Sequence, residues 1–446
     1  MHGAGTDSAG RVRRQRDEME VADLVAEFVW GFRLELGLLA LAAVAFGALV
    51  MKAGLSMVAA GFVLAATLGV VLGFEPVRRT VGHAFYAAHV RRAWWRAWLH
   101  CGLARVRAGK VRRVPAGEQV TVRVSRGFSF EDIAARAEEL AACLGVRELR
   151  VERDPSNASL GVVTLVRRDP LADLGGRQWP CLEAVGMSLW DPIALGLDEL
   201  GRTVRTLLPE RNMLIGGEPG AGKSAVLALL IAAAALDRKV KLWLLDGKRV
   251  ELAAWEPCAA RLVGPDVAEA IELLEQVQAA MEDRYRHLLT RGLRKVAEGL
   301  PLYVVACDEL AFYLTCEDRK QRTRFAELLR DLVARGRAAG VIVLAATQKP
   351  STDVVPSSLR DLFGFRLALR CTTPQASDTI LGQGWASQGH SAATISAADR
   401  GVGFLLADDG LPVRLRSFYL TDEQITGLAE RARDLRRSSR VEVLPS

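Results

Sequence analysis

The sequence predicts an α/β protein whose main domain has a mostly parallel sheet, preceded by a small α+β module and an N-terminal transmembrane hairpin of two helices. Three observations predict this fold: a glycine-rich loop motif, apolar strands that alternate with helical runs from Pro192 onward, and two long uncharged stretches near the N-terminus. Apolar strands that alternate with helices are typical of a parallel sheet covered on both faces. In such a sheet, the ligand binds at the carboxyl ends of the strands.

The octapeptide at residues 217–224 reads G-x-x-x-x-G-K-S and lies between an apolar run and a long helical run. This strand–loop–helix setting distinguishes a phosphate-binding loop from a chance match. We expect Lys223 to reach the β- and γ-phosphates of a nucleotide and Ser224 to help hold Mg²⁺. The residues predicted to contact the nucleotide are Gly217, Glu218, Pro219, Gly220, Ala221, Gly222, Lys223, Ser224 and Ala225.

A second apolar strand, residues 302–307, ends in two acids. Asp308 is predicted to contact Mg²⁺, directly or through water, and Glu309 to polarise the attacking water, because hydrolysis of a triphosphate needs both roles. The next strand ends at Gln348, which can sense the γ-phosphate and orient water or be a simple polar residue at a strand end. Together with the phosphate loop, the paired acids predict a site that hydrolyses a nucleoside triphosphate.

Two uncharged runs near the N-terminus, residues 36–51 and 53–74, are separated by Lys52. The second run is about 33 Å long as a helix, enough to cross a bilayer core of roughly 30 Å. We therefore expect residues 33–74 to form a transmembrane hairpin, although two buried core helices of a soluble domain are the alternative. Arginines flank the hairpin on both sides, which predicts a multi-pass protein of the cell membrane with both termini and the main domain in the cytoplasm.

Basic residues are concentrated just after this hairpin. The whole chain has a net charge of +7, whereas residues 75–115 alone carry +9, so the rest of the chain is slightly acidic. Trp94, Trp95 and Trp98 lie in the same segment. Aromatic rings beside arginines are typical of a helix at the membrane surface that binds anionic lipid headgroups, and an ordinary amphipathic linker helix is the alternative.

Composition and patterning place the other boundaries. We expect a basic cytoplasmic tail at 1–32, a basic juxtamembrane segment at 75–115, the α+β module at 116–190, the main domain at 191–420, and a C-terminal helix and tail at 421–446. The seven cysteines form no C-x-x-C pair, which favours reduced cytoplasmic thiols over a disulfide or zinc framework.

Several further motifs resemble those of the FtsK/SpoIIIE motors. Residues 245–252 resemble the family motif D-P-K-x-x-E-L, and residues 281–285 resemble M-E-x-R-Y. Residues 337–340 resemble R-A-x-G, and residues 346–351 resemble A-T-Q-R-P-S. Residues 364–369 resemble P-T-R-I-A-F, and residues 377–381 resemble S-R-T-I-L. The likeness runs in order over about residues 119–407, and Asp378 stands where the family has an arginine.

This resemblance implies a RecA-like ATPase that uses ATP and Mg²⁺ and works as a homo-hexameric ring around double-stranded DNA, tethered by membrane helices. It also implies an arginine supplied by the neighbouring subunit. Arg337 and Arg366 are the candidates, and each could equally be a structural ion-pair partner. The DNA is expected to thread the ring past loops near Lys349 to Arg360, which contact phosphates without reading sequence.

Little of the chain follows Leu420, so the family's sequence-reading domain is expected to be missing. The chain in this respect looks like the plasmid or integrative-element transfer proteins of actinobacteria.

The leading hypothesis is a membrane-anchored, ATP-driven translocase of double-stranded DNA in conjugative transfer. One alternative is the ATPase of a protein secretion system that engages polypeptides, whose relatives carry several motor domains where this chain has one phosphate loop. Another is an ATP-binding membrane scaffold.

Overall fold

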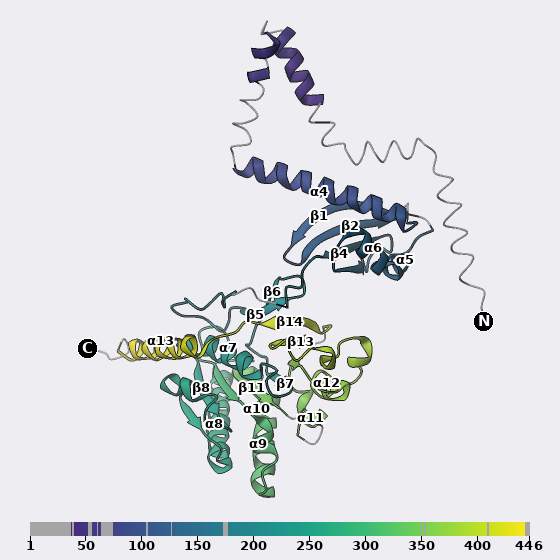
Figure 1. Ribbon diagram of the computed structural model, residues 1–446. Helices are drawn as coiled ribbons and strands as arrows, with labels where there is room; N and C mark the ends of the chain where they lie inside the picture. The colour runs from purple at the N-terminus through teal and green to yellow at the C-terminus, as the bar shows by residue number, and fades with distance from the viewer. Residues whose placement is uncertain are drawn as a thin grey trace, which may run out of the picture. The chain divides into compact units, whose positions relative to one another are not determined.

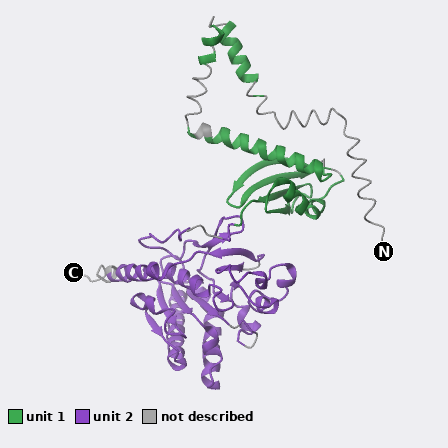
Figure 2. Ribbon diagram, in the orientation of Figure 1, with its two compact units in different colours: residues 1–169 green, residues 170–446 purple. Residues whose placement is uncertain are grey.

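The chain contains two compact units, residues 1–169 and 170–446 (Figure 2). The computed structural model describes residues 37, 40–51, 56–59, 61–63, 75–103, 106–125, 127–172, 177–348, 350–351, 354–407 and 410–441. The predicted tail at 1–32 and much of the predicted hairpin at 33–74 lie outside the described residues. Among the residues that are described, no helix has the length and apolar character needed to cross a membrane.

The first unit contains a four-stranded antiparallel sheet in the order β1-β2-β4-β3. Its strands are β1 (Val106–Val114), β2 (Gly117–Val124), β3 (Glu148–Arg153) and β4 (Leu160–Val166). The helices that pack with this sheet are α4 (Glu75–His100), α5 (Phe130–Ala135) and α6 (Ala137–Leu144). Side chains from all three helices and from one face of the sheet form a single hydrophobic core, so the helices cover that face (Figure 1).

Helix α4 differs from the sequence prediction for residues 75–115. Trp94 and Trp98 are each 1% exposed and pack in the core against Val120 and Val122 of β2. The interpretation of these two tryptophans as residues at a membrane surface is therefore wrong. The basic segment instead supplies a helix and the edge strand β1 to the α+β module, because its apolar residues complete the module's core.

The second unit is built on a ten-stranded sheet in the order β6-β5-β14-β13-β12-β7-β11-β10-β8-β9. The six strands from β12 to β9 are parallel, and the other four are antiparallel. The parallel strands are β7 (Met213–Gly216), β8 (Lys241–Leu245), β9 (Arg261–Val263), β10 (Tyr303–Cys307), β11 (Val341–Thr347) and β12 (Phe365–Leu369). The antiparallel strands are β5 (Ile193–Asp198), β6 (Thr203–Thr206), β13 (Val402–Ala407) and β14 (Val413–Ser417).

Helices cover both faces of this sheet, as the sequence predicts. Met213 and Ile215 of β7 pack in one core with α7 (Lys223–Leu236) and α13 (Asp422–Val441). Leu214 points to the other face and packs in a second core with α8 (Val267–Thr290) and α10 (Arg319–Ala339). The shorter helices are α9 (Leu310–Leu314), α11 (Ser357–Arg360), α12 (Pro374–Leu381) and the 3₁₀ turns η1 (Ala253–Cys258), η2 (Ala386–Gln388) and η3 (Ala392–Thr394).

Helix α13 is an integral part of the second unit. Leu428, Ala429 and Ala432 are buried in the core that also contains α7. Arg436 donates hydrogen bonds to the carbonyl oxygens of Ala235 and Val240, which lie at the end of α7 and just before β8. These bonds satisfy carbonyl groups at a helix end that would otherwise lack partners.

Replacement of Trp98 by alanine tests the packing of α4. We expect Trp98→Ala to lower the free energy of unfolding of the first unit by about 3–5 kcal/mol, because it leaves a cavity in the core. Denaturant titration followed by tryptophan fluorescence measures the change. Trp95→Ala is the matched control, since Trp95 is only half-buried. Equal losses in the two variants would contradict the packing of α4 on the sheet.

Candidate nucleotide-binding site

The phosphate loop connects the buried strand β7 to helix α7, which begins at Lys223. Gly222 precedes the helix with φ of +109°, a conformation that side-chain-bearing residues rarely adopt. A Cβ atom at this position would lie 2.8 Å from the backbone nitrogen of Gly401, which donates a hydrogen bond to the Ala221 carbonyl. The glycine therefore lets the loop fold tightly and lets the segment before β13 approach it.

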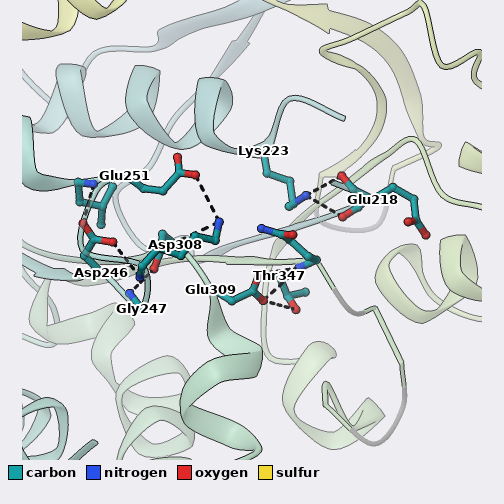
Figure 3. Close-up of polar contacts among 12 residues, drawn as sticks. Glu218, Lys223, Asp246, Gly247, Glu251, Asp308, Glu309 and Thr347 are labelled. Carbon is teal, nitrogen blue, oxygen red and sulfur yellow. Dashed lines mark hydrogen bonds and ion pairs between the residues drawn. The ribbon is translucent and has the colours of Figure 1, made fainter. Parts of the chain in front are cut away.

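Lys223 points back into its own loop (Figure 3). Its Nζ atom donates to the carbonyl oxygens of Gly217, at 2.8 Å, and Glu218, at 2.7 Å. Burial lowers the pKa of Lys223 to about 8, although the negative charge of Glu309 opposes this shift. The ammonium group is thus held inside the loop by weak neutral acceptors, and a phosphate would be a far better partner.

The sheet order brings the predicted site residues to one edge. Strand β11 lies between β7 and β10, and all three strands are parallel. Thr347 at the end of β11 pairs with Gly216 at the end of β7, and Cys307 at the end of β10 pairs with Ala345 of β11. The phosphate loop, Gln348 and the two acids that follow β10 are therefore neighbours at the carboxyl ends of the strands.

Asp308 is a buried carboxylate with one unused oxygen. Its Oδ1 atom accepts a hydrogen bond from the backbone nitrogen of Gly247 at 2.7 Å, whereas Oδ2 is buried and accepts none. Lys248 Nζ lies 3.9 Å from Oδ2 and 3.3 Å from Glu251. Burial raises the pKa of Asp308 to about 6, and the negative charge of Asp246 contributes to this shift.

These groups fit Mg²⁺. The ion prefers oxygen ligands and is usually held by one or two carboxylates together with the phosphates of a nucleotide. The free Oδ2 atom of Asp308 and the hydroxyl of Ser224 are oxygen donors of this kind. A cation at this position would also offset the cost of burying the Asp308 charge.

Glu309 is held by the end of the neighbouring strand. Its Oε1 atom accepts hydrogen bonds from the Thr347 hydroxyl at 3.2 Å and from the Gln348 backbone nitrogen at 3.1 Å (Figure 3). The sequence analysis assigned a role to the Gln348 side chain, which lines the adjacent cleft. The structure shows that the Gln348 backbone also positions the carboxylate predicted to polarise water.

The cleft beside the phosphate loop has a volume of about 590 Å³. The residues that line it include Lys223, Ser224, Gln348, Arg400 and Tyr419. Arg400 and Tyr419, together with Arg416, which also lines the cleft, were not predicted from the sequence. These residues lie far along the chain and match none of the motifs, so only the antiparallel pairing of β13 and β14 brings them to the nucleotide cleft.

The loop after β8 is folded around a buried acid. Asp246 is fully buried and accepts hydrogen bonds from the backbone nitrogens of Lys248, at 3.1 Å, and Leu252, at 2.9 Å. These bonds direct Lys248 and Glu251 toward Asp308. Asp246 is therefore the buried anchor of a loop whose residues Lys248, Arg249 and Val250 are exposed.

Among the described residues, those that line the cleft beside the phosphate loop do not include Arg337 or Arg366. Arg337 precedes β11 and donates to the Glu210 carbonyl at 2.8 Å, and Arg366, near the start of β12, lies 3.5 Å from Asp361. Both arginines thus contact groups of their own subunit that precede a strand of the sheet. A role toward the nucleotide of a neighbouring subunit stays a prediction.

The structure corrects the expectation for Arg360. This residue is 6% exposed and forms an ion pair with Asp361 at 2.8 Å, so it is not available to contact DNA. Its apolar surroundings, which include Leu359 and Phe363, explain the burial. Lys349, the other basic residue expected in this loop, lies outside the described residues.

Asp378 has a structural role where the resembling motif has arginine. Its carboxylate accepts hydrogen bonds from the backbone nitrogens of Gly384, at 3.0 Å, and Ala386, at 2.8 Å. These bonds hold the turn that follows α12. The departure from the motif therefore fits the local fold of this chain.

A parallel sheet with a phosphate loop and an acidic strand end, arranged in this order, defines a RecA-like P-loop ATPase domain. Residues 192–383 match the model of the FtsK/SpoIIIE family, which confirms the predicted resemblance for this part of the chain.

Known proteins resemble this chain over much of its length. The DNA translocase FtsK of Bacillus cereus is 26% identical over 352 residues, which cover 72% of this chain and 42% of the relative. The chain thus spans less than half the length of that relative. The pCW3 conjugation coupling protein TcpA, solved in a monomer form with ATPγS, superposes with a TM-score of 0.52 at 15% identity, over 78% of this chain and 99% of TcpA. EssC ATPases 2 and 3 of Geobacillus thermodenitrificans give a TM-score of 0.48 at 16% identity, over 59% of this chain and 52% of theirs.

The buried charge of Asp308 leads to a pH-dependent prediction. The pKa of Asp308 is about 6 in the folded protein, above the usual 3.8, so the folded state binds more protons between these values and loses stability as pH rises through them. We expect Asp308→Asn to raise the free energy of unfolding by roughly 3 kcal/mol at pH 7, and this gain should vanish below about pH 3. Denaturant titration without nucleotide measures this difference.

The exposed Asp191 provides the control. Asp191→Asn should leave the stability unchanged at both pH values. Mg²⁺ with ATP should stabilise the native protein and the control, but not Asp308→Asn, because ligand binding stabilises only the state that binds it. A destabilised Asp308→Asn variant at pH 7 would contradict the inferred cost of the buried charge.

Proposed function

We propose that this protein is an ATPase, anchored in the cell membrane by its N-terminal segment, that drives double-stranded DNA through a homo-hexameric ring during conjugative transfer of a plasmid or integrative element. The proposed ATPase activity rests on one observation. Lys223 and Ser224 lie beside Asp308 and Glu309 at the carboxyl ends of the parallel strands. Both termini and the motor domain are proposed to lie in the cytoplasm.

Each of these residues has a defined task in the proposed reaction. Lys223 exchanges its two carbonyl partners for the β- and γ-phosphates of ATP, while Ser224 and Asp308 hold the metal. Mg²⁺, when bound, neutralises negative charge on the phosphates. Glu309 orients and polarises the attacking water, and most of the acceleration comes from positioning and electrostatic stabilisation.

The position of Gln348 provides a route from hydrolysis to movement. Its backbone holds Glu309, its side chain lines the nucleotide cleft, and the predicted DNA loop begins at the next residue. A change at the γ-phosphate would therefore shift the end of β11 and the start of this loop together. We propose that this shared strand end couples hydrolysis to the DNA.

The choice of DNA rests on the similar proteins. The Bacillus cereus relative is named a DNA translocase, and TcpA is named a conjugation coupling protein. The secretion ATPase that engages polypeptides remains the second candidate. The curated relatives that match this chain are named DNA translocases, which favours the DNA motor.

Replacement of Glu309 tests the catalytic assignment. We expect Glu309→Gln to bind ATP as tightly as the native protein but to hydrolyse it about 10²- to 10³-fold more slowly, since the phosphate contacts remain and the base is lost. Lys223→Ala should lose ATP binding as well. Steady-state hydrolysis and equilibrium binding of ATP measure the two properties separately.

The exposed Glu317, which lies outside the cleft, supplies the matched control, and Glu317→Gln should hydrolyse ATP at the native rate. Hydrolysis that survives in Glu309→Gln would remove this residue from the catalytic role. Duplex DNA should stimulate the native enzyme, whereas stimulation by polypeptides but not by duplex DNA would favour the secretion ATPase.

A further inference from the structure

The small module presents basic side chains on the face of its sheet that lies opposite the helices. Side chains along a strand alternate between the two faces, and Val106, Val111 and Val124 point into the core. Their neighbours Arg107, Arg112 and Arg123 therefore point to the other face, and all three are exposed. We call the surface formed by Arg107, Arg112 and Arg123 the arginine face.

Two of these arginines lie directly opposite each other. Arg107 of β1 pairs in register with Arg123 of β2. Like charges at directly opposite positions destabilise a sheet. The fold itself gains nothing from this pair, so a partner outside the described chain is the natural counterpart for the charge.

Two other arginines of the same sheet have partners. Arg150 forms an ion pair with Glu148 at 2.8 Å, and Arg113, on the core side, stacks over the Tyr86 ring at 3.6 Å. Within the part of the chain that the structure describes, none of the three residues of the arginine face forms an ion pair. The module thus neutralises part of its charge and leaves the outer side of the β1–β2 hairpin positive.

The chemistry of this face fits a phosphate backbone. Arginine donates two parallel hydrogen bonds to a phosphate group. A register shift in β1 between Ala108 and Val111 places Arg107 and Arg112 opposite Arg123 and Gln119, which are four residues apart on β2. This span is about 14 Å, close to the length of roughly four nucleotides of a DNA strand. The side chains between them on β2 include Gln119 and Thr121, which are polar and can donate to phosphates.

The same surface does not suit a membrane. Helices and loops that bind bilayers insert large apolar side chains between the headgroups. Among the described residues of β1 to β4, no large hydrophobic side chain is highly exposed. Cations and hydrogen-bond donors without apolar anchors are typical of contacts to nucleic-acid phosphates.

We propose that the arginine face binds the phosphate backbone of double-stranded DNA, without reading sequence and without requiring ATP. The choice of DNA as the polyanion rests on the proposed function, whereas the face itself is independent of the nucleotide site. The module would then keep hold of the duplex while the motor domain exchanges ATP.

Neutralising the opposed pair tests this proposal. The full chain is titrated against a fluorescently labelled duplex over a range of NaCl concentrations, without nucleotide, and anisotropy is recorded. We expect Arg107→Gln/Arg123→Gln to weaken binding equally for duplexes of different sequence. The slope of log K against log salt should fall by about two, one for each lost phosphate contact.

The matched control is Arg96→Gln/Arg153→Gln, which removes two exposed arginines of the same module that lie outside the arginine face. This control should retain the native affinity and salt slope. The melting temperature of Arg107→Gln/Arg123→Gln should be equal to or above that of the native protein, because the repulsion between the two charges is removed.

Equal affinity and salt slope in the test and control variants would overturn the proposal and leave the DNA motor intact. If the native chain binds no duplex at all, both the proposal and the DNA part of the proposed function fail. A variant that loses binding to phosphatidylserine vesicles but keeps its affinity for duplex would show that the face binds membranes, and this result also overturns the proposal.

Discussion

The structure of the nucleotide site depends on two buried charges of opposite sign at one edge of a parallel sheet. Burial lowers the pKa of Lys223 to about 8 and raises that of Asp308 to about 6, so each group is held in surroundings that disfavour its charged form. The loop carbonyls and the Gly247 amide compensate only in part. Bound phosphates would supply the missing partners of Lys223, and a metal ion would supply those of Asp308. Both charged groups are therefore incompletely paired until the ligand binds.

The register of the strands makes this arrangement possible. A single strand, β11, separates the phosphate-loop strand from the strand that carries the acids, and it contributes Thr347 and Gln348 between them. The carboxylate of Glu309 is held by these two residues instead of by its own strand. The predicted water-activating group is therefore positioned by the same strand end that contacts the nucleotide cleft and leads into the predicted DNA loop.

The features that could be predicted from the sequence are local ones. The phosphate loop, the acids after β10 and the alternating strands each depend on short stretches, so their patterns are visible without a structure. Arg400 and Tyr419 could not be found in this way, because only the pairing of distant antiparallel strands brings them to the cleft. Arg360 and Trp98 were misinterpreted for a related reason: a basic residue or an aromatic ring looks the same in sequence whether it is exposed or packed in a core.

The most direct test of the central claim is a structure of the full chain with Mg²⁺ and a non-hydrolysable ATP analogue. The account predicts that Lys223 Nζ leaves the carbonyl oxygens of Gly217 and Glu218 for the β- and γ-phosphates, and that Asp308 Oδ2 faces the metal directly or through one water. A nucleotide bound elsewhere, or a Lys223 that keeps both carbonyl partners beside a bound triphosphate, would contradict it.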